Sequence, residues 1–161
     1  MAMMGRMYTM GFNGATLGTS GPQDLLAVYT GSSKIIAPRS VNLSPAIGST
    51  TISNLRIRLR YLPTTVTSGS GGGAGTIARW VAGDAAATAT GRINDTTQAT
   101  TSGTAVDLWD DAWNTINGFL WAPASPNQPP IIGISGAFIV SLDSTPAALV
   151  VSGSVTFEEL P

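Results

Sequence analysis

Carboxylates and tryptophans gather in one short stretch of the chain, residues 104–123. This stretch holds three aspartates and three of the four tryptophans, namely Asp107, Asp110, Asp111, Trp109, Trp113 and Trp121. Paired carboxylates serve glycosidases as acid and base, indole rings form platforms for sugars, and clustered carboxylates can hold Ca²⁺. The alternative interpretation places the tryptophans in the core and the aspartates at a turn. The spaced ligands and fixed glycine of a calcium loop are missing, so we expect no metal.

A second group of charged residues lies in the clearest periodic segment, residues 52–63. Three arginines alternate there with four apolar residues, in the order Leu55, Arg56, Ile57, Arg58, Leu59, Arg60 and Tyr61. This period of two predicts a strand with one core face and one guanidinium face. Like charges on one face need compensation, either within the chain from Glu158 and Glu159 or from a neighbouring subunit. Arg56, Arg58 and Arg60 are therefore candidate contacts to an acidic partner or to polyphosphate.

The chain has neither cysteine nor histidine. This composition excludes thiolate nucleophiles, Ser-His relays and imidazole metal ligands, and we expect no enzyme activity and no cofactor. The glycine run at residues 69–75 follows a predicted strand but lacks the helix and the acidic partner of a dinucleotide site. It predicts a flexible, exposed hairpin loop.

The elements that carry these residues are predicted to be strands. The chain has 161 residues with only two Glu, one Lys and 11% charged residues, so it lacks the usual material of helix surfaces. About eight strands are expected, the clearest at residues 25–31, 38–45, 52–63, 137–143 and 147–160. Their regular spacing favours a single all-β domain, a β-sandwich with a jelly-roll-like order.

The amino-terminal residues fit neither period. Residues 1–24 contain Met3, Met4, Met7 and Met10 and repeated glycine. Because methionine makes adaptable apolar contacts, we interpret residues 1–24 as an arm that orders on a partner, and residues 25–161 as the sandwich domain. A net charge of −1 argues against nucleic acid, and no apolar run is long enough to cross a membrane.

From residue 54 to residue 160 the order of motifs resembles a family of small proteins encoded among the head genes of tailed phages and prophages. The motifs are LRIRLRYLP, TSGSGGG, AGDAAATAT, NDTTQATT, WNTINGFLWAP and the ending AFIVSLDSTPAALVVSGSVTFEEL. The resemblance implies a virion protein that decorates the capsid, a cement protein, with no catalytic residues. It implies a homotrimer seated on the outside of the head, where it binds the major capsid protein after assembly in the bacterial cytoplasm.

Three other functions remain open at this point, the weakest of which is a hydrolase that uses Asp107, Asp110 and Asp111. A carbohydrate- or receptor-binding head fibre module would expose Trp109, Trp113 or Trp121 in a concave site. Another virion structural role, in the tail or in head completion, fits the same composition.

Overall fold

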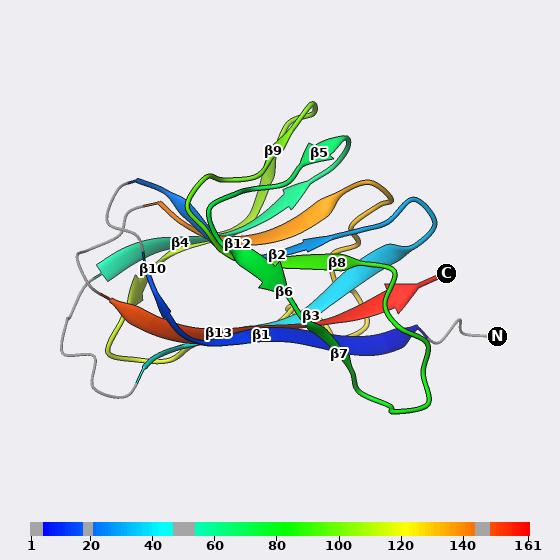
Figure 1. Ribbon diagram of the computed structural model, residues 1–161, viewed down its shortest axis with the longest axis horizontal. Helices are drawn as coiled ribbons and strands as arrows, with labels where there is room; N and C mark the ends of the chain where they lie inside the picture. The colour runs from blue at the N-terminus through cyan, green and yellow to red at the C-terminus, as the bar shows by residue number, and fades with distance from the viewer. Residues whose placement is uncertain (1–4, 18–20, 47–53, 144–148) are drawn as a thin grey trace.

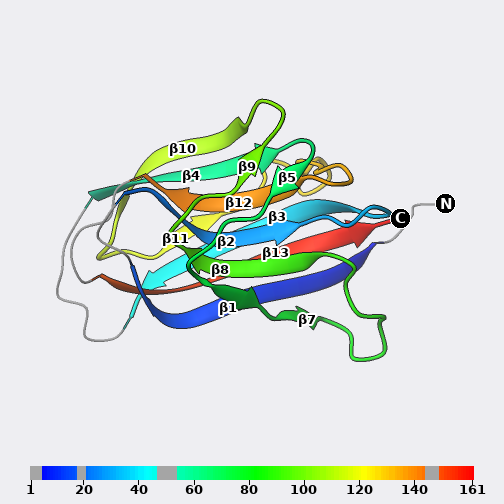
Figure 2. The same cartoon turned by 45° about the horizontal axis from the view of Figure 1, so that its top comes forward.

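The computed structural model describes residues 5–17, 21–46, 54–143 and 149–161, and they form two antiparallel sheets packed face to face (Figure 1). The predicted all-β sandwich is confirmed. The described residues contain no helix, and therefore no helix able to span a membrane. Residue 6 is paired with residue 159, so the first described strand begins at the same end of the sandwich at which the chain ends (Figures 1 and 2).

The five-stranded sheet has a short strand at each margin, and the six-stranded sheet has a short strand at one margin. The five-stranded sheet has the order β11 (Phe119–Trp121), β3 (Ile35–Pro45), β13 (Val150–Leu160), β1 (Arg6–Thr16) and β7 (Ile77–Arg79). The six-stranded sheet has the order β10 (Val106–Asn114), β4 (Asn54–Leu62), β12 (Ala137–Leu142), β2 (Gln23–Tyr29), β8 (Thr90–Asp95) and β6 (Gly73–Gly75). One edge of the sandwich is therefore made by β10 and β11, and the opposite edge by β6 and β7.

The core lies between the sheets and follows the alternation read from the sequence. Leu55, Ile57 and Leu59 of β4 are buried there, while the arginines between them point outward. Val155 and Phe157 of β13 face them from the other sheet. Each such side chain removed from water contributes about 1.5–3 kcal/mol, so the inward faces of the long strands supply most of the stability.

A second apolar layer covers the outer face of the six-stranded sheet. Strands β2 and β12 are buried along their whole length because β5 (Val66–Thr67) and β9 (Thr100–Thr101) form a small flap above them (Figure 1). Tyr29, Leu62 and Ile139 pack there with alanines of the flap and the sheet. We call residues 63–72 and 96–105 the flap.

The predicted arm is wrong for the residues that the structure describes. Residues 6–16 form β1, which pairs with β13 on one side and with β7 on the other. Tyr8 and Met10 are fully buried, and residues 23–24 already belong to β2. The sandwich therefore begins well before residue 25. Met3 and Met4 lie outside the described residues.

The glycine run at residues 69–75 packs closely against the neighbouring backbone and does not form a flexible loop. A Cβ at Gly72 would lie 2.1 Å from the Ile93 carbonyl oxygen, so glycine is required where this segment approaches β8. Gly71 has a φ of +88°. Backbone bonds between Ser70 and Thr97, at 3.1 and 2.9 Å, hold the run in place. The predicted exposure is confirmed for residues 70–74 but is wrong for Gly69, which is buried, and the predicted flexible hairpin is replaced by β6 paired with β8.

Candidate functional site

The three arginines of β4 lie on the outer face of the six-stranded sheet, where aspartates of the same chain compensate them. Arg56 binds Asp110 of β10, with Nε donating to Oδ1 at 2.9 Å, and it approaches Asp143 at 3.0 Å. Arg58 pairs with both Asp107 and Asp143. The hydrogen bond from Arg56 lowers the pKa of the Asp110 carboxyl. Compensation within the chain is thus observed.

The predicted partners of the arginines were the wrong carboxylates. Glu158 pairs with Arg39 and accepts the Gly5 N–H at 2.9 Å. Glu159 accepts the backbone N–H groups of Thr88 and Ala89 at 2.8 and 2.9 Å, which fastens the segment between β7 and β8. Both glutamates lie on the five-stranded sheet, in β13, and therefore on the other layer from the arginines.

The candidate interface residues are placed differently from one another. Arg56 keeps 55% of its side chain exposed, whereas Arg58 and Arg60 are mostly covered. Met7 is half-buried on β1, and Met10 is fully buried with its sulfur facing Gly75 and Gly91 of the other sheet. Met10 is therefore a core residue rather than a surface contact. The interface role of Arg56 stays a prediction.

The aspartates and tryptophans of residues 104–123 lie on strands, so the predicted turn is wrong for the aspartates. An irregularity between Asp107 and Trp109 shifts the register of β10 by one residue. Asp107 and Asp110 consequently face the arginines of β4, while Trp109, Asp111 and Trp113 lie on the opposite side of the strand. Asp107 and Asp110 are engaged in ion pairs rather than set against each other as an acid and a base.

The three tryptophans of this stretch have separate environments. Trp113 is buried and donates its indole N–H to the Asn117 carbonyl at 2.8 Å. Trp121 is also buried and packs against Phe138, with ring centroids 6.0 Å apart. Trp109 is 43% exposed, so the core interpretation holds for two of the three.

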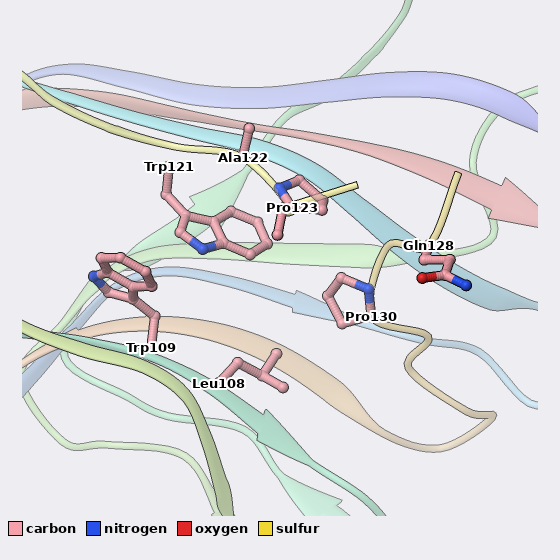
Figure 3. A pocket seen from close by; sticks show the side chains of 8 residues that line it. Leu108, Trp109, Trp121, Ala122, Pro123, Gln128 and Pro130 are labelled. Atoms are coloured by element: carbon pink, nitrogen blue, oxygen red, sulfur yellow. The ribbon is translucent and has the colours of Figure 1, made fainter. Parts of the chain in front are cut away.

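Trp109 and Trp121 form a pocket of about 460 Å³ at the edge where the two sheets meet (Figure 3). Its wall is continued by the proline-rich segment after β11, and it is lined by Leu108, Trp109, Trp121, Ala122, Pro123, Ala124, Gln128 and Pro130. Apart from the two indole N–H groups, Gln128 carries the one polar side chain among these lining residues. The two indoles face each other across the left side of the pocket, with Pro123 and Pro130 to the right (Figure 3). The apolar lining suits an apolar or aromatic group in size and chemistry.

A row of polar residues beneath the flap was missed by the sequence analysis. One outward residue from each of five neighbouring strands stands in register across the sheet, in the order Asp110, Arg58, Ser141, Asp24 and Asp95. Asp24 and Asp95 are directly opposite each other, and both are almost fully buried. The row is created by pairing between strands that are distant in the sequence, so no local sequence motif predicts it.

These two buried carboxylates hold the flap. Asp24 accepts hydrogen bonds from the Ala99 N–H at 2.7 Å and from the Gln98 amide at 3.0 Å. Asp95 accepts the Gly72 N–H at 3.1 Å and binds Arg92 at 2.6 and 2.7 Å. Burial raises the pKa of Asp24 to about 6, despite these hydrogen bonds, and nearby Asp95 adds to the rise.

Exposed apolar side chains gather at the two edges of the sandwich. Six of them belong to β10, to β11 and to the segments that flank β11, namely Val106, Trp109, Ile116, Leu120, Ile131 and Ile134. Trp80 and Val81 follow β7 at the opposite edge.

Comparisons of the chain with models of known families, with curated proteins and with solved structures find no match.

Proposed function

We propose that the chain is a phage capsid decoration, or cement, protein that binds the outside of the head as a homotrimer. The observation that carries the proposal is the exposed apolar surface at both edges of the sandwich, which includes Trp80 and Trp109. Exposed patches of this kind, rimmed by polar residues, mark contacts with other proteins. The resemblance of residues 54–160 to phage head proteins supplies the identity of the partner.

The strand order supports the finer proposal of a jelly roll. The strands β1 to β4 alternate between the two sheets, and β10 to β13 alternate again. A sandwich of this kind brings distant segments together in a rigid body whose edges and outer faces remain available for contacts.

Cementing would follow from mass action at many equivalent sites. A protein that binds the assembled shell, but not its loosened state, adds its binding free energy at every site that it occupies. A trimer multiplies the effect, because its second and third contacts to major capsid subunits form at high effective concentration. In this proposal the protein is assembled in the bacterial cytoplasm and remains on the capsid surface.

Co-sedimentation with purified heads tests this proposal. Heads of the encoding phage, prepared without the protein, should retain the added chain to a fixed stoichiometry and should resist heating to a higher temperature afterwards. Heads of an unrelated phage serve as the control. Equal recovery with both kinds of head, or no recovery with either, contradicts the proposal.

Arg56→Ala tests the predicted contact of the β4 arginines in the same assay. Because Arg56 is more than half exposed, solvent screens its ion pairs and they contribute little to folding, so the variant should fold normally. We expect its retention on heads to be reduced. Unchanged occupancy removes Arg56 from the shell interface without touching the decoration proposal.

Carbohydrate binding is the second candidate function, and the exposure of Trp109 in a concave pocket favours it. It ranks second because the lining side chains offer hydrogen-bonding groups only at Gln128 and at the two indoles, whereas a sugar presents many hydroxyls to satisfy. A glycan array with tryptophan-fluorescence titration decides between the two. We expect no saturable quenching; quenching that disappears in Trp109→Ala would establish the sugar site.

A further inference from the structure

A tryptophan projects from the edge opposite the pocket. Trp80 is 62% exposed and Val81 is 60% exposed, in the segment that follows β7 and extends away from the body of the sandwich (Figures 1 and 2). Its base is fixed, because the Trp80 N–H donates to the Met7 carbonyl at 3.1 Å and Glu159 holds residues 88 and 89. A tryptophan presented on a fastened segment is typical of an anchor residue at a protein interface.

The pocket between Trp109 and Trp121 matches this group in size and chemistry. Its volume of about 460 Å³ lies within the range of sites that enclose small molecules, and it is lined by indole, proline and aliphatic groups. Offset or tilted stacking on Trp109 would place an incoming indole between apolar walls. The side-chain amide oxygen of Gln128 can accept a hydrogen bond from the incoming indole N–H, whereas one amide would pair with few of the hydroxyl groups of a sugar.

Trp80 and the pocket stand at the same level of the five-stranded sheet. The backbone N–H of Trp80 donates a hydrogen bond to the carbonyl of Met7. Met7 is paired with Glu158 of β13, and Glu158 is paired in turn with Ala37 of β3. At the other edge, Trp121 is paired with Val41 and Ile132 bridges Ile36. The pocket wall, residues 121–130, therefore runs beside residues 36–41, a stretch that includes Ala37.

Charges beside the two features are complementary. Arg79 precedes Trp80 and makes no ion pair within the described residues. Asp111 shares the side of β10 that bears Trp109, and it too has no cation partner within the described part of the chain. A net charge of −1 leaves little repulsion between two copies.

We propose that Trp80 of one copy inserts into the Trp109–Trp121 pocket of a second copy. The inference rests on the proposed self-association of the chain and specifies its surfaces. The contact is heterologous, because it joins two different edges of the same sandwich. Anchor and pocket stand at one level along the strands, so the contact does not displace successive copies along the strand direction, as a closed ring requires.

Molar mass in solution tests this interface. Light scattering after size exclusion should give a small multiple of 16.5 kDa for the wild type. Trp80→Ala should weaken association by roughly 30-fold or more, the loss typical of a tryptophan anchor, and give mostly monomer. Ile116→Ala removes an equally exposed apolar group that does not line the pocket and should leave the mass unchanged. A monomeric wild type, or an unchanged Trp80→Ala oligomer, overturns the inference.

Cross-linking tests the geometry directly, because the chain has no cysteine of its own. Val81→Cys mixed with Ala124→Cys should form a disulfide between copies on oxidation, since Ala124 lines the pocket. Each variant alone should remain uncross-linked. A dimer formed by Val81→Cys alone would indicate a two-fold contact and overturn the heterologous arrangement.

Failure of this interface is distinguishable from failure of the decoration proposal. If Trp80→Ala is monomeric but the wild type does not bind heads, the ring stands and the proposed function fails. If the wild type binds heads and Trp80→Ala retains its mass, the function stands and the interface lies elsewhere.

Discussion

Replacement of Met10 by alanine should lower the free energy of unfolding by about 2–5 kcal/mol. Met10 is fully buried on β1, and its sulfur lies where a Cβ at Gly75 or Gly91 would come within 2.2 and 2.1 Å. The methionine thus fills a hollow made by two glycines of the opposite sheet, and its loss leaves a cavity between the layers. Urea unfolding followed by tryptophan fluorescence measures the change.

Met7 provides a matched control on the same strand. It is half-buried and faces the other side of β1, so Met7→Ala should cost well under half of the Met10→Ala loss. Equal small losses for both variants would mean that residues 6–16 behave as an arm and not as a strand of the sandwich.

The contact between Met10 and Gly91 can be tested with a double variant. Gly91→Ala combined with Met10→Ala should recover part of the free energy of unfolding that Gly91→Ala alone loses, because the added methyl group occupies the space that the methionine vacates.

The stability of the protein should carry a contribution from Asp24 that falls as the pH rises. The pKa of Asp24 is about 6 in the folded chain against 3.8 for the free side chain, so the folded state binds more protons between these values. The contribution is complete below about pH 4, is lost as the pH rises through 6, and amounts to about 3 kcal/mol. When Asp24 is protonated, the outer face of the six-stranded sheet keeps equal numbers of paired charges. They are the aspartates Asp95, Asp107, Asp110 and Asp143 and the arginines Arg56, Arg58, Arg60 and Arg92.

Asp24→Asn isolates this contribution from the other carboxylates. Unfolding in urea at pH 4, 5, 6 and 7 should show that the wild type loses stability relative to the variant across this range. The flanking groups Asp95, Arg60 and Arg92 are present in both proteins, so the two proteins differ only in the titratable group at position 24. Parallel pH profiles for the two proteins would contradict the assignment.

The sandwich was predictable because its longest strands show their period in sequence. Arginine alternates with leucine and isoleucine in β4, and serine, threonine and glutamate alternate with apolar residues in β13. Because one face of each of these strands is buried and the other is not, apolar and polar residues alternate along the strand, and this alternation can be recognised from the sequence alone. In β1 the same period exists as Tyr8 and Met10, but the neighbouring glycines and methionines conceal it.

The candidate site was predictable only in part, because long-range pairing creates it. The irregularity in β10 puts Asp107 and Asp110, three residues apart, on the same face, which a period of two forbids. The pocket needs Trp109 and Trp121 from different sheets, and the Asp24–Asp95 pair needs β2 beside β8. Their residue types were visible in the sequence, whereas their neighbours depend on the topology.

Electron cryo-microscopy of the phage heads to which we propose that the chain binds tests the central proposal most directly. We expect β-sandwich density in groups of three on the outer capsid surface, with neighbouring copies joined edge to edge between the Trp80 segment and the Trp109–Trp121 pocket. Heads that lack this density, or virions that carry the chain only on the tail, would contradict the decoration function.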